Sequence, residues 1–131
     1  MKSEFETLNQ VSVLLVDDAS IIRRAIKGLL KDEPQIKLLG EAGSFHDAIL
    51  MTVALKPDVI LLDLHMPDDS SFKPAFVKHQ LGGSRVLAMS LPGDCERLDE
   101  TEMLAKSFGA ITMLDKADLH EFLIPAILSQ R

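Results

Sequence analysis

The sequence predicts an α/β domain built on a parallel sheet that carries helices on both faces. Five short apolar runs show little of the alternation expected of a half-exposed strand, which is typical of strands buried on both sides. Segments with helical spacing follow these runs, and strands that alternate with helices favour parallel pairing through right-handed crossovers. Three of the runs end in charged residues, so we expect one strongly polar edge of the sheet.

We expect the strands at residues 11–16, 37–42, 59–62, 86–89 and 110–114. A first helix follows the first strand, and Pro34 prevents its continuation past Glu33. The apolar stripe of this helix consists of Ile21, Ile22, Ala25, Ile26, Leu29 and Leu30. The basic residues of its other side, which we interpret as a solvated face, are Arg23, Arg24, Lys27 and Lys31.

The remaining helices are bounded by turn and capping residues. Gly43 and Ser44 provide a turn and a helix cap before the second helix, and Pro74 suits the first turn of a third helix at 72–80. Gly109 is a suitable residue after the end of a fourth helix. Asp118 is the expected cap of a last helix at 119–129.

Pro125 should bend this last helix or delay its start. We also assign four apolar residues of the carboxyl-terminal part to the core: Met103, Leu104, Met113 and Leu114.

Length and composition indicate one soluble domain. The chain has 131 residues, which we divide into a leader at 1–10 and a domain at 11–131. Its net charge of −6 argues against direct nucleic-acid binding. The single cysteine, Cys95, fits a reducing compartment, and no segment resembles a signal peptide or a membrane span. We therefore expect a cytoplasmic protein without membrane contact.

The charged strand ends predict one site. Asp17 and Asp18 follow the first strand, Asp63 follows the third, Lys116 follows the fifth, and Ser90 lies just past the fourth. Ends of parallel strands meet at the edge where α/β folds bind ligands. Two carboxylates about 5 Å apart, at an effective dielectric near 20, repel by roughly 3 kcal/mol, so the cluster should take up a proton or recruit a cation.

Hard oxygen ligands of this kind suit Mg²⁺ shared with a phosphate, and a lysine supplies a mobile charge for the phosphate. A carboxylate in such surroundings is a candidate nucleophile toward phosphorus, which would give an aspartyl phosphate. Taken singly, Asp17 and Asp18 are equally well explained as a helix cap, and Lys116 as a surface lysine. Their joint position at strand ends favours the site.

The segments VLLVDD, ILLDLHMPD, Ser90 and LDK, in this order, resemble the receiver (CheY-like) domain of bacterial two-component response regulators. The resemblance implies a flavodoxin-like doubly wound sheet of order 2-1-3-4-5 with five helices. It also implies a phosphoprotein of a signal-transduction phosphorelay that catalyses only its own phosphorylation and dephosphorylation, and is otherwise not an enzyme.

The same resemblance assigns roles to the site residues. It makes Asp63 the phosphoacceptor, and Ser90 and Lys116 the side chains that contact the phosphoryl group. Mg²⁺ would be held by Asp17, Asp18 and Asp63, with the backbone carbonyl of His65. The implied partners are a histidine kinase or histidine phosphotransfer protein and a downstream protein or output domain. A second copy of the chain is a further candidate partner.

The sequence departs from the family pattern beside the site. Met113 stands where an aromatic residue is usual, Leu91 where a small residue follows the hydroxyl, and Ala117 where proline is common. Ser71 occupies the place of the glycine expected after the Met-Pro turn, and the stretch 90–108 is about one helical turn longer than usual. We therefore expect intact phosphorylation chemistry with an altered output.

Three alternatives remain. The stretch KDEPQIKLLGEA resembles receivers that precede a helix-turn-helix domain, so the chain could be a fragment of a transcriptional regulator. Leu91 and Met113 leave room for a degenerate receiver that binds partners without a normal phospho-switch. A Mg²⁺-dependent phosphatase of the haloacid dehalogenase type would place its two aspartates one residue apart, whereas Asp17 and Asp18 are adjacent.

Overall fold

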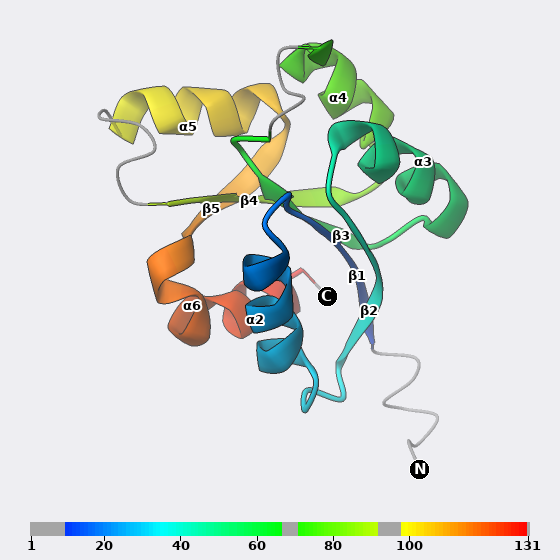
Figure 1. The fold of residues 1–131 in the computed structure, drawn as a ribbon, viewed down its shortest axis with the longest axis vertical. Coiled ribbons are helices and arrows are strands. Elements are labelled where there is room, and N and C mark those ends of the chain that lie inside the picture. Colours follow the sequence, from blue (N-terminus) through cyan, green and yellow to red (C-terminus); the bar gives the residue numbers. More distant parts are fainter. Residues whose placement is uncertain (1–9, 67–70, 92–97, 131) are drawn as a thin grey trace.

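A computed structural model describes residues 10–66, 71–91 and 98–130 of the chain. The expected leader, apart from Gln10, therefore lies outside the described residues, as do Cys95 and part of the long 90–108 stretch. The described residues form a five-stranded parallel sheet of order β2-β1-β3-β4-β5 (Figure 1). This is the doubly wound arrangement expected from the sequence.

The strands match the apolar runs closely. They are β1 (Val11–Val16), β2 (Ile36–Ala42), β3 (Val59–Asp63), β4 (Arg85–Ser90) and β5 (Ala110–Asp115). Val16 pairs with Leu62, Asp63 with Met89, and Ser90 with Asp115, so the carboxyl ends of the inner strands lie side by side. β3 is buried along its whole length, in agreement with a run that does not alternate. Burial on both sides was the wrong expectation for β5, which lies at the edge of the sheet and has only Leu114 buried.

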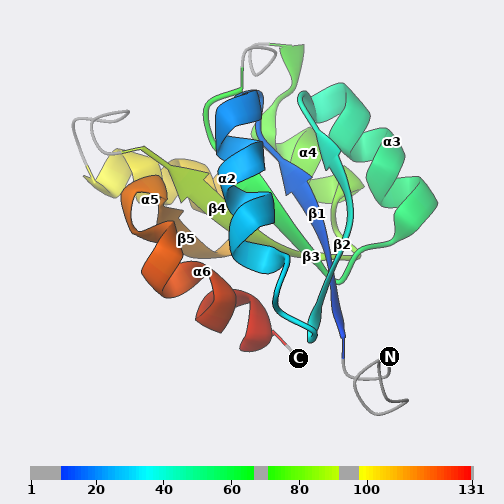
Figure 2. The ribbon, with the colours of Figure 1, turned by 60° about the horizontal axis from the view of Figure 1, so that its bottom comes forward.

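The helices cover both faces of this sheet. They are α2 (Ser20–Leu30), α3 (Phe45–Leu55), α4 (Pro74–Gln80), α5 (Leu98–Ser107) and α6 (Leu119–Leu128), with a 3₁₀ turn η2 (Lys116–Asp118). Helices α2 and α6 lie on one face, and α3, α4 and α5 lie on the other (Figures 1 and 2). No helix within the described ranges is both long and apolar enough to cross a bilayer.

Alternate residues of the central strands supply two separate cores. Leu14, Ile60 and Leu62 point to the face of α3, α4 and α5, where they join Phe45 and Phe108. The rings of these two phenylalanines are stacked with centroids 5.3 Å apart. The neighbouring strand residues Val13, Leu15 and Leu61 point to the opposite face. There they pack with Ile26 of α2 and with Leu123 and Ile127 of α6.

Three of the expected core positions are wrong. Ile21 is 73% exposed, and Ala25 is also exposed, because only the Ile26 and Leu30 side of α2 meets the sheet closely. Met103 is 68% exposed, on the outer side of α5. In contrast, Leu114 is buried, and Met113 is half-buried against the core.

Local capping agrees with the sequence at the starts of α3 and α4 and at the end of α5. Ser44 accepts a hydrogen bond from the Asp47 N–H at the start of α3, and Pro74 occupies the first turn of α4. Gly109 has φ of +83°, which is the left-handed conformation expected after the end of α5.

The start of α6 differs from expectation. The Asp118 side chain makes no capping hydrogen bond; instead Asp115 accepts one from the Ala117 N–H (2.8 Å) at the start of η2. The 3₁₀ turn thus moves the cap three residues upstream. Pro125 does not delay α6, which begins at Leu119 and continues through the proline.

Candidate functional site

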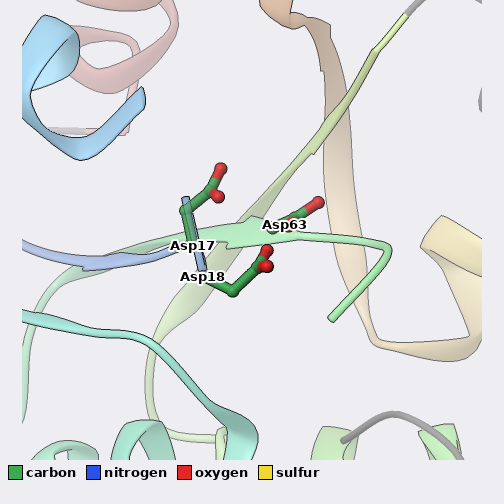
Figure 3. Close-up of side chains that lie close together, drawn as sticks. All are labelled: Asp17, Asp18 and Asp63. Atoms are coloured by element: carbon green, nitrogen blue, oxygen red, sulfur yellow. The ribbon is translucent and has the colours of Figure 1, made fainter. Parts of the chain in front are cut away.

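An acidic cluster occupies the carboxyl edge of the sheet. Asp17 and Asp18 follow β1, and Asp63 is the last residue of β3. One carboxylate oxygen from each of the three residues lies within 4.8 Å of the others, and the side chains surround a common space (Figure 3). The strand order causes this meeting, because β1 and β3 are direct neighbours in the sheet. The separation agrees with the value assumed from the sequence.

Lys116 brings an ammonium group to the same place. It follows β5 at the start of η2, and its side chain is only 4% exposed. Its Nζ lies 2.7 Å from Asp17 Oδ2 and 3.3 Å from Asp63 Oδ1. The lysine is therefore a buried partner of two carboxylates, and the alternative of a solvated surface lysine is wrong.

Asp17 is fully buried, and its polar groups are held by four neighbours. Its N–H donates to the Ala42 carbonyl (3.0 Å), and its Oδ1 accepts from the Ala19 N–H (2.9 Å). Its Oδ2 contacts Lys116, and its own carbonyl accepts a hydrogen bond from Arg23 Nη1 at 2.6 Å. Asp17 thus forms a turn with Ala19 and belongs to the cluster, while the adjacent Asp18 is exposed. The cap residue of α2 is Ala19, without a side-chain hydrogen bond, so the alternative explanation of Asp17 and Asp18 as a helix cap is wrong.

Asp63 is a buried carboxyl under opposing influences. Burial is the largest of them and, with the nearby charge of Asp17, raises the pKa of Asp63 to about 6. The His65 N–H, which donates to Asp63 Oδ1 at 3.1 Å, and the Lys116 ammonium act in the opposite direction. Near neutral pH this side chain is therefore largely ionised but poorly hydrated, which favours attack on an electrophile.

The lysine remains charged in this setting. Burial alone would lower the pKa of Lys116, but the hydrogen bond to Asp17 and the charges of Asp63 and Asp17 outweigh it, so the pKa is raised. A permanent ammonium partly neutralises the cluster. Three carboxylates against one ammonium still leave an excess of negative charge, and the exposed Asp18 gives a cation access to it.

Ser90 and His65 border the cluster. Ser90 ends β4 between the ends of β3 and β5, and it is buried. His65 is half-buried, and its backbone N–H holds Asp63. Met66 is buried in the core on the face of α3, α4 and α5, whereas Pro67 of the expected Met-Pro turn lies outside the described residues.

The residues that depart from the family pattern lie in or after β4 and β5 and ahead of α4. Leu91 is exposed directly after Ser90, and Ser71 is exposed ahead of α4. Ala117 donates its backbone N–H to Asp115, a hydrogen bond that a proline at this position could not make. Met113 pairs with Ala88 in the sheet and packs on the core of the α3, α4 and α5 face.

Arg23, Lys27 and Glu41 form a second charged group that the sequence did not indicate. Arg23 Nε lies 2.8 Å from Glu41 Oε1, and Lys27 Nζ lies 2.7 Å from Glu41 Oε2. Hydrogen bonds from Lys27 and Arg23 hold the pKa of Glu41 below its ordinary value. The prediction of a solvated face on α2 is therefore wrong for Arg23, whose side chain is 21% exposed, whereas Lys27 is exposed as expected. The position of Glu41 near the end of β2 could have indicated this group, because Glu41 is another acidic residue at a strand end.

Comparison with known proteins agrees with this geometry. Residues 13–117 match the family model of the response regulator receiver domain, so the chain belongs to this family of two-component signal-transduction domains. It is 32% identical over 108 residues to protein-glutamate methylesterase/protein-glutamine glutaminase 2 of Methanosarcina acetivorans, which covers 81% of this chain and 29% of that protein.

Two proteins of Mycobacterium tuberculosis are also similar. The DNA-binding transcriptional activator DevR/DosR is 40% identical over 63 residues, which is 48% of this chain and 29% of that protein. The signal receiver domain of the putative response regulator NarL superposes with a TM-score of 0.75 at 26% identity, covering 92% of this chain and 95% of that one. The chain thus spans less than a third of the curated relatives and corresponds to their receiver part.

Proposed function

We propose that this chain is a cytoplasmic phosphoryl-accepting receiver, in which Asp63 takes a phosphoryl group from a phosphohistidine of a histidine kinase or histidine phosphotransfer protein. The observation that carries the proposal is the buried Lys116 ammonium in contact with both Asp17 and Asp63. A lysine buried against two acids at the strand ends suits a phosphate. Its ammonium group supplies positive charge, and its side chain does not cap a helix or a turn.

In the proposed transfer, a carboxylate oxygen of Asp63 forms a bond to phosphorus. The phosphorus–nitrogen bond of the donor breaks, and the imidazole keeps that electron pair and takes a proton from solvent. Lys116 Nζ neutralises charge on the phosphoryl oxygens, and the Ser90 hydroxyl at the end of β4 donates a hydrogen bond to one of them. The reaction depends on positioning and charge neutralisation rather than on further covalent steps by the protein.

The residues at the cluster fit Mg²⁺. Asp17, Asp18 and Asp63 offer hard oxygen ligands within 4.8 Å of one another, and the His65 carbonyl completes the protein ligands that the family resemblance implies. When bound, Mg²⁺ supplies charge neutralisation for the phosphoryl oxygens. The exposure of Asp18 leaves one side of the cluster accessible to the ion and its waters.

Phosphorylation would be read by partner proteins. It adds a charge of about −1.5 to −2 at the end of β3, which biases the loops after β3 and β4. The neighbouring surface of α5, β5 and α6 exposes Met103, Ile111 and Phe122, which suit contact with a downstream protein, an output domain or a second copy of the chain. The methylesterase and DNA-binding functions named for the relatives are not assigned to this chain.

The first experiment is incubation with MgCl₂ and acetyl phosphate, followed by intact-mass measurement. We expect the mass increment of one phosphoryl group in the wild-type protein and in Asp32→Asn, an exposed-site control. Asp63→Asn should give no adduct. A wild-type protein without an adduct would contradict the proposal and favour a receiver that binds partners without phosphorylation. An adduct that persists in Asp63→Asn would contradict the assignment of Asp63 as the phosphoacceptor.

A further inference from the structure

The backbone of Asp17 is held from both sides. The Asp17 N–H donates to Ala42 of β2, and the Asp17 carbonyl accepts from Arg23 Nη1 at 2.6 Å. That carbonyl belongs to the same peptide plane as the N–H of Asp18. The arginine therefore fixes the direction in which the chain leaves Asp17, and with it the position of the exposed Asp18 carboxylate.

Arg23 is itself held in place. Its Nε donates to Glu41 Oε1 at 2.8 Å, while Lys27 Nζ contacts the other oxygen of Glu41 at 2.7 Å. The Arg23 side chain is 21% exposed, so solvent competes only in part for its hydrogen bonds. A planar guanidinium can bind the Asp17 carbonyl and Glu41 at the same time, which the single ammonium of a lysine does less well.

Gly43 borders the guanidinium of Arg23. A Cβ atom at this position would lie 3.6 Å from Arg23 Nη1, which is an ordinary van der Waals contact. The group formed by Arg23, Glu41 and Lys27 thus connects the end of β2 with the first turns of α2 behind the acidic cluster.

We propose that Arg23 is a positioning residue of the cation site: through its hydrogen bond to the Asp17 carbonyl it holds Asp18 in place for a divalent cation. This inference rests on the proposed function, because it requires the acidic cluster to bind Mg²⁺. Glu41 acts indirectly, by orienting Arg23.

Charge alone predicts the opposite effect. Arg23 is a cation close to the cluster, so replacing it with a neutral residue should tighten Mg²⁺ binding if only electrostatics mattered. If positioning dominates, the replacement weakens binding. Arg24 provides the matched control, because it is the adjacent arginine of α2, is exposed, and loses the same charge on substitution.

The test is a titration with MgCl₂ followed by amide NMR of ¹⁵N-labelled protein, because the chain lacks tryptophan and tyrosine as fluorescent reporters. The Ala19 and His65 amides donate to Asp17 and Asp63 and report the two halves of the cluster. We expect Arg23→Gln to weaken Mg²⁺ affinity about three- to tenfold, the equivalent of one hydrogen bond. Arg24→Gln should bind as tightly as wild type or more tightly.

Further variants separate positioning from general loss of structure. Arg23→Lys keeps the charge but should stay weakened, and Glu41→Gln should weaken binding less than Arg23→Gln. The double variant Arg23→Gln/Glu41→Gln should bind no more weakly than Arg23→Gln alone, because both changes break one connection. In cation-free protein, Arg23→Gln should shift the Ala19 resonance while that of His65 stays in place.

Two failures can be told apart. If wild type shows saturable Mg²⁺ binding and Arg23→Gln binds equally well or more tightly, Arg23 has no positioning role and the proposed function stands. If wild type shows no saturable shifts, the proposed metal site itself is wrong, and the role of Arg23 falls with it. Should Arg23→Gln fail to fold, Arg23→Lys and Glu41→Gln decide between these outcomes.

Discussion

The acidic edge and the surface of β5, α5 and α6 differ in how closely they follow the receiver pattern. At the acidic edge Asp17, Asp63 and Lys116 are buried and paired, and all three lie within the residues matched by the family model. On the other surface Met113 and Ala117 depart from it, and Ile111 is 56% exposed. A buried charge without its partner is costly, whereas an exposed side chain can be exchanged at little cost.

The comparison therefore teaches that substitutions should cost most at the buried charged site and least at the exposed positions of β5, α5 and α6. Substitutions in the two regions should therefore change the free energy of unfolding by different amounts. The following predictions proceed from the largest expected effect to the smallest.

Lys116→Met should lower the free energy of unfolding by about 3 kcal/mol or more in EDTA, because it leaves Asp17 and Asp63 buried without their ammonium. Urea unfolding followed by circular dichroism measures the change, and the loss should be smaller in excess MgCl₂. Lys106→Met, at an exposed position of α5, is the control and should have little effect. Equal stability of both variants would refute the view that Lys116 is needed to neutralise the buried acids.

Asp63→Asn should stabilise the cation-free protein at pH 7.5 by roughly 1 to 3 kcal/mol. The pKa of Asp63 is raised from 3.8 to about 6 in the folded state. The free energy of unfolding therefore falls as pH rises through this interval, and above it the ionised carboxyl destabilises the folded protein. Removal of the carboxyl should therefore stabilise most above pH 6 and hardly at all near pH 4.

Thermal unfolding of Asp63→Asn and wild type across this pH range checks the prediction. Asp32→Asn, at an exposed position, serves as the control and should follow the wild type. A stability difference for Asp63→Asn that stays constant with pH would show that burial does not raise the pKa of Asp63.

Ala117→Pro, which restores the residue common in the family, should destabilise by about 1 kcal/mol because it removes the N–H that Asp115 caps. Asp115→Ala removes the same hydrogen bond from its other end and should cost a similar amount. In urea unfolding, the double variant should lose the free energy of one hydrogen bond plus a small residual, and no more. Full additivity of the two losses would mean that they have separate causes.

Ile111→Ser should change the free energy of unfolding by less than about 0.5 kcal/mol, since this side chain of β5 is more than half exposed. The rate of phosphorylation by acetyl phosphate should also be unaffected. A buried residue of the adjacent strand, Leu87, gives the contrast: Leu87→Ala should cost about 2 to 5 kcal/mol. A large effect of Ile111→Ser would show that this surface is under structural constraint after all.

The sheet and the acidic cluster could be predicted because both follow from strand ends. Unbroken apolar runs indicate buried parallel strands, and the neighbouring positions of β1 and β3 bring Asp17 and Asp63 together without further information. Strand β5 adds Lys116 to the same edge. The chemistry needs these residue types, and their positions at strand ends make them visible in the sequence.

Features set by side-chain reach could not be predicted. Six apolar positions in α2 cover more than one side of the helix, so periodicity could not show that Ile21 faces solvent. Arg23 lies on the polar side by the same periodicity, yet its long side chain reaches back to the Asp17 carbonyl. The cap before α6 was ambiguous, because both Asp115 and Asp118 precede suitable N–H groups and the 3₁₀ turn selects the first.

The salt bridges of Lys116 join residues from the first, middle and last strands of the chain. If β5 and α6 detach, the two acids lose their counter-charge at the same moment that the inner strands lose apolar cover. Electrostatic repulsion and solvent exposure then act together against a partly open form. The site thereby links the two ends of the chain into one cooperative unit, so that partial unfolding from the carboxyl-terminal side should be poorly populated.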